Sequence, residues 1–247
     1  MGAPTISLVT GTWNRPDAFR RLVKAVFDRA RVPTEIVVAD CSEKPVASSD
    51  FPGLPISVIH DWPKTSMVRG YNRCFARARG DWVVWANDDA EPLPGWDEAA
   101  LVFMQGHPEV GMGAVYYSQN GGPFHVNEYQ GHVYANFGFL KRKLGDSLGW
   151  YDIDLRMYGS DNSLTLKVLL AGLGVVGIPG AYWLHHSVQD QQRMANEKLQ
   201  SVDATILHEN YKDRFAAARA VFEKYRHLQK DMCLSVDVAS AVAGRAR

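Results

Sequence analysis

Apolar residues in the first hundred positions fall into short continuous runs that alternate with stretches of helical spacing. The runs at 6–9, 35–39, 56–59 and 82–86 predict four strands that are buried on both faces. Apolar residues at helical spacing predict helices over 16–30 and 66–79, the second capped by Ser66 and ended by Gly80. The order strand–helix–strand–strand–helix–strand indicates an α/β fold with a mostly parallel central sheet flanked by helices.

The second half of the chain has a less regular pattern. Helical spacing over 97–105, an apolar run over 110–117 and a glycine- and aromatic-rich stretch over 121–140 come first. A helix over 160–171, ended by Gly172, and a strand over 174–178 follow. From about residue 190 a broken apolar stripe in a polar sequence predicts further helices, and we expect the terminal AVAGRAR to be frayed.

Charge and cysteine content exclude several classes of protein. Lys plus Arg and Asp plus Glu both number 27, and a net charge of zero argues against a general nucleic-acid binder. The three cysteines are far apart with no CxxC pair, which fits a reducing compartment, so we expect a cytoplasmic protein. No secretory signal is expected at the start, and the longest apolar stretch contains Lys167 and several glycines, so no transmembrane segment is expected.

Polar residues follow three of the predicted strands, where ligands bind in open parallel sheets. They are residues 10–14 after the first strand, Asp40 after the second, and residues 87–89 after the fourth. Asp40, taken alone, is interpreted equally well as a ligand contact and as a turn or helix-cap residue. Asp88 and Asp89 are adjacent like charges, which must be solvated, paired or bound to a cation. A solvated turn before Pro92 is one interpretation, and a site for Mg²⁺ or Mn²⁺ shared with phosphates is the other.

Four segments, in this order, resemble the inverting family 2 nucleotide-sugar glycosyltransferases of the GT-A fold. They are ISLVTGTWNRPDAFRRLV, EIVVADCSEKP, SMVRGYNRCFARARGDWVVWANDDAEPLPGW and LKRKLGDSLGWYDIDLRMYGSDNSLTLKVLLAGLGV, with AYWLHHSV after them. The resemblance implies a nucleotide-diphosphate sugar donor, of UDP or dTDP type, and a glycan or other hydroxyl acceptor. It also implies Mn²⁺ or Mg²⁺ as cofactor.

The resemblance assigns roles to residues on the donor side. It places Asp40 on the nucleotide base, Asp88 near the ribose and metal waters, and Asp89 on the metal. In AYWLHHSV, only one of the paired histidines can point inward from a strand, and family position favours His185 as a metal ligand. The remaining residues expected at the nucleotide sugar are Thr10, Thr12, Asn14, Arg69, Asn72 and Asn87.

On the acceptor side the resemblance places Asp161 on the catalytic base. An acceptor hydroxyl is a poor nucleophile until a base takes its proton, and a single displacement then inverts the sugar carbon. Asp161 also suits a helix amino end, which favours the ionised form that a base requires. The sequence departs from the family at Ser160 and Ser163, which replace the flanking acids. Trp150 and Ser160 are the candidate acceptor contacts, and Trp13, Trp62 and Trp96 also lie in expected loops.

These expectations divide the chain into a GT-A domain over 1–190 and a helical C-terminal extension over 191–247. The domain comprises a nucleotide-binding half of about 1–97 and an acceptor half of about 98–190. The extension could pack on the domain, cover the acceptor cleft, or pair two subunits in a homodimer. Two other functions stay open: a catalytically degenerate nucleotide-sugar binding or scaffold module, and a sugar-phosphate nucleotidyltransferase. The latter should carry a glycine-rich loop after the first strand, whereas TGTWNRPDAF lacks those glycines.

Overall fold

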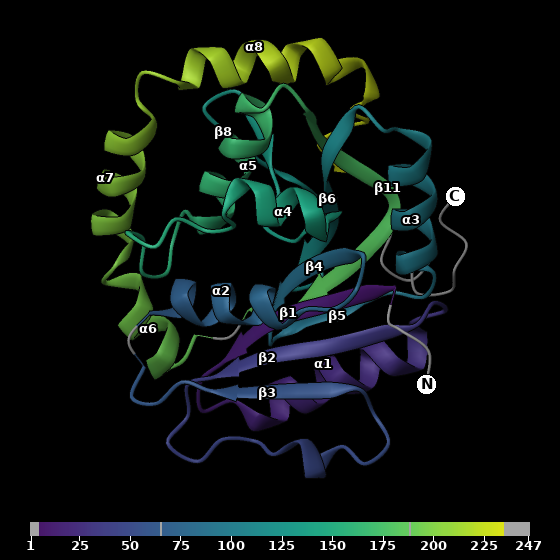
Figure 1. Ribbon diagram of the computed structural model, residues 1–247, viewed down its shortest axis with the longest axis vertical. Helices are drawn as coiled ribbons and strands as arrows, with labels where there is room; N and C mark the ends of the chain where they lie inside the picture. Colours follow the sequence, from purple (N-terminus) through teal and green to yellow (C-terminus); the bar gives the residue numbers. More distant parts are fainter. Residues whose placement is uncertain (1–4, 65, 188, 235–247) are drawn as a thin grey trace.

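The computed structural model describes residues 5–64, 66–187 and 189–234, and the AVAGRAR terminus lies outside them. Its centre is a ten-stranded sheet with the order β12-β7-β6-β10-β4-β1-β2-β3, in which β11 pairs with both β6 and β5 (Figure 1). The strands are β1 (Ile6–Thr12), β2 (Thr34–Asp40), β3 (Ile56–His60), β4 (Trp82–Asn87), β5 (Ala90–Pro92), β6 (Val110–Gln119), β7 (Phe124–His125), β10 (Gly138–Lys141), β11 (Gly174–His185) and β12 (Cys233–Leu234). A separate hairpin is formed by β8 (Asn127–Tyr129) and β9 (His132–Tyr134).

Strands β3, β2, β1 and β4 run parallel to one another, as the sequence predicts. Strand β10 pairs with β4 in the antiparallel direction. The helices are α1 (Pro16–Arg29), α2 (Met67–Arg77), α3 (Trp96–Gly106), α4 (Arg142–Leu148), α5 (Ser160–Leu170), α6 (Gln191–Glu197), α7 (Gln200–Tyr211) and α8 (Phe215–Tyr225), with short 3-10 turns η1 (Ser48–Asp50) and η2 (Arg226–Leu228). The predicted fold class, a mostly parallel sheet flanked by helices with further C-terminal helices, is confirmed.

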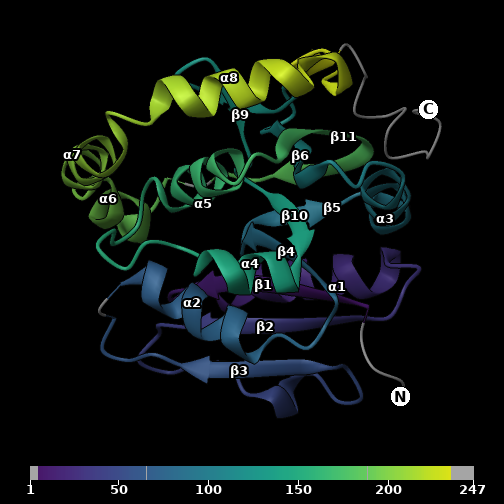
Figure 2. The same cartoon turned by 45° about the horizontal axis from the view of Figure 1, so that its top comes forward.

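Both faces of the sheet are buried, which explains the continuous apolar runs. Side chains alternate along β1, so that Leu8 joins one hydrophobic cluster with α1 and α3, whereas Val9 joins another with α2. Figure 2 shows α2 and α1 on opposite sides of the β1–β3 layer. The sheet is therefore a rigid platform whose strand ends can hold a site.

Among the differences between observed and predicted element boundaries, three concern β1, β11 and α2. Strand β1 continues to Thr12, so Thr10 and Thr12 are strand residues. Strand β11 continues to His185 because an irregularity between Ile178 and Tyr182 lets it resume pairing with β6. Helix α2 ends at Arg77, and Gly80 is not its cap: a Cβ at Gly80 would lie 2.6 Å from the Ser7 nitrogen, so glycine is needed there for close approach to β1.

The C-terminal helices are packed against the rest of the molecule. Helix α8 lies across α5. Helix α7 lies at the left edge of the molecule in Figures 1 and 2, to the left of α5. Their buried side chains belong to the same hydrophobic cluster as α2 and the sheet: Leu207, Tyr211, Ala218 and Phe222. Of the three expected arrangements, packing on the domain is therefore observed. The domain boundary near residue 190 and the homodimer stay predictions.

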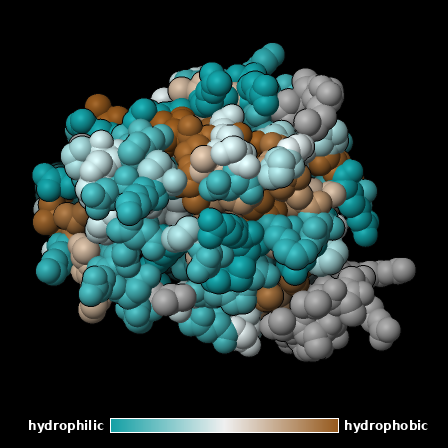
Figure 3. All heavy atoms as spheres, turned by 90° about the horizontal axis from the view of Figure 1, so that it is seen from below, coloured by the Kyte–Doolittle hydropathy of each residue, from teal (hydrophilic) through white to brown (hydrophobic). Residues whose placement is uncertain are grey.

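The surface seen from below in Figure 3 is mainly hydrophilic, with hydrophobic residues gathered in a band across its upper half. Among the residues that the structure describes, six large hydrophobic side chains are exposed: Leu54, Trp62, Val102, Ile153, Met194 and Val202. Within the described ranges, no helix has the length and apolar character needed to cross a membrane.

Candidate active site

A cavity of about 300 Å³ opens where β1 and β4 end. Segments from across the chain line it: the turn after β1, the end of β4, the end of β11, the beginning of α5, and α6. Its lining includes Trp13, Arg15, Lys64, Asn87, Asp88, Asp89, Ser160, Asp161, His185, Arg193 and Asn196. The sheet thus brings the predicted acidic pair, base and histidine to one place.

Asp88 and Asp89 are both nearly buried, with 4% and 5% of their surface exposed. The Thr12 hydroxyl donates a hydrogen bond to Asp88 Oδ2 at 2.7 Å, so Thr12 holds the pair in place from the end of β1. Burial, and then the neighbouring charge of Asp89, raise the pKa of Asp88 to about 7. The negative charge of Asp89 thus disfavours ionisation of Asp88, as predicted for adjacent carboxylates, and a positive partner offsets this effect.

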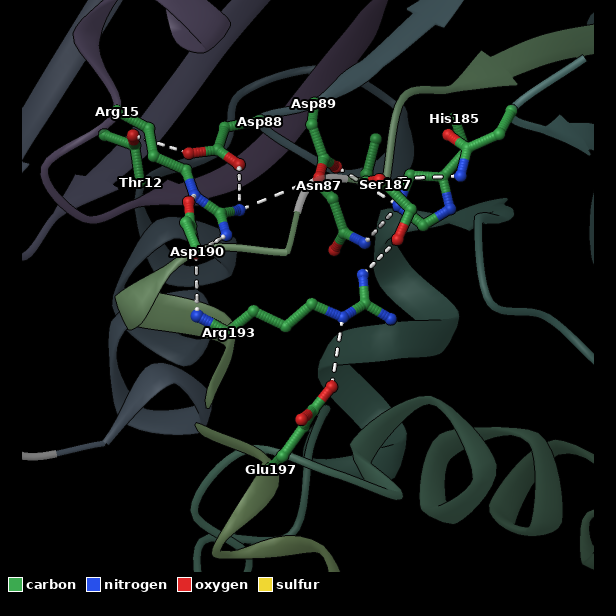
Figure 4. A network of polar contacts seen from close by, with 12 residues as sticks. Thr12, Arg15, Asn87, Asp88, Asp89, His185, Ser187, Asp190, Arg193 and Glu197 are labelled. Carbon is green, nitrogen blue, oxygen red and sulfur yellow. Dashed lines mark hydrogen bonds and ion pairs between the residues drawn. The ribbon is translucent and has the colours of Figure 1, made fainter. Parts of the chain in front are cut away.

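That partner in the structure is Arg15, which sequence analysis did not single out. Its Nη1 lies 3.4 Å from Asp88 Oδ1 and 3.6 Å from Asp89 Oδ2. Its Nε and Nη2 donate to the two carboxylate oxygens of Asp190, each at 2.6 Å (Figure 4). A signal was available, because Arg15 is the first cation after β1 in a loop that had to lie beside the acids. The partner Asp190, 175 residues away, could not be inferred.

Asp89 and His185 lie close together, as expected for metal ligands. His185 Nε2 is 3.2 Å from Asp89 Oδ1, and Asn87 Nδ2 is 3.4 Å from the same ring nitrogen. Asp89 Oδ1 and His185 Nδ1 are buried without a hydrogen-bond partner. His186 points away, with a 43% exposed side chain that faces Glu91, so a single histidine faces the cavity, as the alternation of strand residues predicts.

The donor set fits a divalent cation that takes part of its coordination from elsewhere. The Asp89 Oδ1 atom, which is buried without a hydrogen-bond partner, and the adjacent Nε2 of His185 are suitable ligands for Mn²⁺ or Mg²⁺. Within residues 5–64, 66–187 and 189–234, however, no three His, Cys, Asp or Glu side chains form a metal site by themselves. A cation held there would therefore take further ligands from other groups, such as substrate oxygens or water.

Asp161 lies in the first turn of α5 and faces the cavity. One carboxylate oxygen accepts the Asn162 backbone N–H at 2.9 Å. Burial raises the pKa of Asp161 to about 6, against the opposing effect of the backbone N–H groups. Burial therefore has a larger effect on this pKa than the helix amino end, which was expected to favour the ionised form. Ser160 also lines the cavity. Ser163 does not, because it is fully buried and its hydroxyl donates to the Ser160 carbonyl oxygen in the same helix.

Two predicted contact residues, Asp40 and Asn72, have other partners. Asp40 is buried and its two oxygens accept the backbone N–H groups of Ser42 and Val46, each at 2.8 Å, which closes a turn. The Asn72 amide donates to the Tyr151 carbonyl oxygen at 2.9 Å and accepts the Tyr151 N–H at 3.1 Å. Neither residue lines the cavity. Asp40 thus has the turn role that sequence analysis left open, and its contact with a base stays a prediction.

Trp150 is not available as an acceptor contact in this structure. It is 6% exposed and its ring stacks on Phe75 with centroids 4.1 Å apart, because the turn after α4 directs it into the core. Trp96 is also buried, against Trp183. Among the other predicted donor residues, Thr10 is fully buried, Asn14 and Arg69 are exposed, and none of the three lines the cavity.

Trp13 does line the cavity, together with a second cation that sequence analysis missed. Lys64 Nζ lies 4.1 Å from the centroid of the Trp13 ring. Burial lowers the pKa of Lys64 to about 8. With Arg15, this places two positive side chains on the donor side of the cavity, which suits an anionic ligand.

The fold is shared with known nucleotide-sugar enzymes. The S. aureus TarS structure in complex with UDP-GlcNAc matches with a TM-score of 0.64 and 14% identity, over 77% of this chain and 61% of that one. The mannosyltransferase PcManGT from Pyrobaculum calidifontis, in complex with GDP-Man and Mn²⁺, matches with a TM-score of 0.59 and 13% identity, over 94% and 77%. Together with the site geometry, these structures define a GT-A glycosyltransferase fold.

The family follows from the sequence. The profile of glycosyl transferase family 2 matches residues 7–159, and the chain belongs to this family, which is an inverting one. The chain is also 26% identical over 174 residues to the uncharacterized glycosyltransferase YwdF of Bacillus subtilis (strain 168), covering 62% of this chain. It spans 64% of the length of YwdF. The profile match ends just before Asp161, so the base assignment depends on the site geometry.

Proposed function

We propose that this protein transfers a sugar from a UDP- or dTDP-type nucleotide sugar to an acceptor hydroxyl with inversion, with Asp161 as the base. The observation that carries the proposal is one cavity holding two different carboxylate environments. On one side Asp89 and His185 have buried atoms without partners, beside the cation Arg15. On the other side Asp161 is solitary, with a pKa raised to about 6 by burial.

In the proposed reaction, the acceptor oxygen forms a bond to the anomeric carbon as the bond from that carbon to the diphosphate breaks. Asp161 takes the proton of the acceptor hydroxyl, and the nucleoside diphosphate leaves from the opposite face, which inverts the carbon. Arg15 places positive charge where negative charge develops on the leaving group.

Asp89 and His185 would hold Mn²⁺ or Mg²⁺, with Asp88 beside them. When bound, such a cation supplies charge neutralisation of the diphosphate. Structures similar to this chain support the assignment: PcManGT is described with GDP-Man and Mn²⁺, and GalNAc-T7 with UDP, GalNAc and Mn²⁺. TarS is described with UDP-GlcNAc, which supports a uridine donor.

Retention of Asp161 at the cavity favours an enzyme over a scaffold module. The replaced acid at position 163 removes nothing from the cavity, because Ser163 is buried within α5. The family membership in turn favours glycosyl transfer over nucleotidyl transfer. The acceptor class, a glycan or another hydroxyl compound, and the cytoplasmic location stay predictions.

The proposal is tested by donor binding and turnover with and without metal. We expect UDP-GlcNAc with Mn²⁺ to raise the melting temperature and stabilise the fold by about 2.7 kcal/mol at 100 times its Kd. We also expect slow release of UDP in the same mixture. Asp89→Ala should lose both metal-dependent effects, while Asp17→Ala, which removes an exposed carboxylate in α1, should keep them. A melting shift that is equal in Asp89→Ala and independent of Mn²⁺ would contradict the proposed metal site.

A further inference from the structure

The segment that leads into the base has no regular structure of its own. Residues 150–159, called here the base loop, connect α4 to α5 through turns and bends. Met157, Tyr158 and Gly159 line the cavity immediately before Ser160 and Asp161. The position of the base therefore depends on whatever fixes this loop.

Asp203, on α7 in the C-terminal extension, binds the base loop directly. Its side chain is fully buried. Oδ1 accepts the backbone N–H of Arg156 at 3.1 Å, and Oδ2 accepts those of Met157 and Tyr158, each at 2.8 Å. Hydrogen bonds from N–H groups to a charged carboxylate are stronger than neutral ones, and three to consecutive residues fix both the place and the direction of the backbone.

Further contacts from α7 hold the same loop. The Tyr211 hydroxyl donates to Asp152 Oδ2 at 2.7 Å, and Lys167 on α5 pairs with Asp152 Oδ1 at 2.5 Å. Leu207 packs on Gly159 so closely that a Cβ there would lie 3.1 Å from Leu207 Cδ2. Helix α7 therefore contacts the base loop near its beginning and at its end.

The opposite side of the base loop is fixed by the amino end of α2. The Ser66 hydroxyl donates to the Arg156 carbonyl oxygen at 3.0 Å, while the N–H of Arg156 is donated to Asp203. The peptide groups around Arg156 are thus held between α2, which belongs to the nucleotide-binding half, and α7. Loss of the α7 side would leave three N–H groups without acceptors inside the protein.

We propose that Asp203 is a positioning residue for the base Asp161, and that α7 is therefore part of the acceptor side of the active site. The inference depends on the proposed function, since it assumes that Asp161 is the base. Asp203 lies outside the family 2 match, which ends at residue 159. A small displacement of a base from its proton is enough to reduce the rate of a reaction strongly.

The experiment compares Asp203→Asn with Asp213→Asn, which makes the same chemical change at an exposed position after α7. Amide hydrogen exchange reports on the base loop without any need for turnover. UDP release from UDP-GlcNAc with Mn²⁺ gives kcat, and titration with UDP and Mn²⁺ gives a donor-side Kd. Tyr211→Phe is a second variant, which removes the hydrogen bond from α7 to Asp152 at almost constant volume and tests whether α7 positions the base loop if Asp203→Asn does not fold.

For Asp203→Asn we expect exchange at residues 156–158 to accelerate and kcat to fall, each by about 10-fold or more, with the Kd for UDP changed less than about 3-fold. We also expect the pH midpoint of kcat to fall, because water admitted to Asp161 relieves the burial that raises its pKa. Tyr211→Phe should show the same pattern at smaller size, and Asp213→Asn should match the wild type.

Unchanged exchange, unchanged kcat, or a Kd that weakens in parallel with kcat would each overturn the role of Asp203. Failure of the proposed function gives a different result: the wild type would release no UDP, or Asp161→Asn would retain turnover. In that case the exchange data still decide whether Asp203 fixes the base loop.

Discussion

The donor and acceptor sides of the cavity both bury carboxylates, but different groups stabilise the negative charge on each side. On the donor side Asp88 and Asp89 adjoin, and Arg15 contacts both. On the acceptor side Asp161 has backbone N–H groups as its hydrogen-bond donors. Burial raises the pKa of Asp88 to about 7 and that of Asp161 to about 6. The pair is suited to attract cations, whereas the solitary acid is suited to accept a proton.

The two sides also differ in what holds them. The donor residues follow parallel strands in fixed register, with Gly11 opposite Asn87 and Thr12 opposite Asp40. Asp161 instead follows an irregular loop that is held by side chains of α7. The donor side is thus built into the sheet, while the acceptor side depends on tertiary contacts made far along the chain.

The largest expected effect separates the two sides directly. Asp161→Asn keeps the shape of the side chain but cannot take a proton, so we expect kcat for UDP release or sugar transfer to fall by about 10²–10⁴-fold. The Kd for UDP with Mn²⁺ should stay within about 2-fold, because donor contacts lie on the other side of the cavity. Steady-state kinetics and calorimetric titration measure the two quantities.

The wild-type pH profile belongs to the same prediction. A base works only when ionised, so kcat should rise with pH through about 6, the raised pKa of Asp161. Asp154→Asn, at an exposed position in the base loop, should leave rate and profile unchanged. Normal turnover in Asp161→Asn would show that another group is the base.

The sequence predicts the donor side better than the acceptor side, for a physical reason. Parallel strands must end at one edge, so Asp88 and Asp89 could be placed at the site from the pattern, whereas His185 was placed there by the family resemblance. Arg15 was missed because the conformation of the loop after β1 decides which way its side chain points.

Two of the predicted contact residues have other partners in the structure, and the two cases have a common cause. Trp150 was expected at the acceptor, yet it stacks on Phe75, and Asn72 was expected at the donor, yet its amide binds the Tyr151 backbone. Both partners are defined only once α2 and the base loop pack together. Asp203 gave no local signal either, since its three partners lie 45–47 residues away.

The second prediction concerns stability, and its sign follows from the pKa. The pKa of Asp161 is raised from 3.8 to about 6 on folding. Below pH 3.8 the carboxyl is protonated in both the folded and unfolded states, and as pH rises through 6 the folded state loses stability by burying a charge. Asp161→Asn removes that loss, so the variant should be more stable than the wild type at pH 8, by up to about 3 kcal/mol.

Urea unfolding at pH 4, 6 and 8 measures this difference, which should be smallest at the lowest pH. Asp154→Asn is again the control, and it should show no pH-dependent gain because the position is exposed. A variant that is less stable than the wild type at pH 8 would mean that Asp161 contributes more as a hydrogen-bond acceptor than its burial costs. The buried carboxylate of Asp161 would then not be destabilised in its ionised form, which is the property that makes this acid a good base.

The smallest expected effect tests the donor side. Arg15→Gln removes the cation beside Asp88 and Asp89 and the bidentate pair with Asp190. We expect the Kd for UDP with Mn²⁺ to weaken by about 10-fold, because one charge-assisted contact to the diphosphate is lost. The Kd of Arg15→Lys should lie between those of the wild type and Arg15→Gln, since a single ammonium cannot reproduce the forked contact to Asp190.

Arg20→Gln is the matched control, because Arg20 is an exposed arginine of α1 that pairs with the exposed Asp17. It should leave the Kd unchanged. The pH midpoint of kcat should stay near 6 in Arg15→Gln even as the donor binds more weakly, since Arg15 is not among the groups that shift the pKa of Asp161. A shifted midpoint would show that the two sides are electrostatically coupled, and the separation between a cation-binding pair and a solitary base would then have to be replaced by a single charged network.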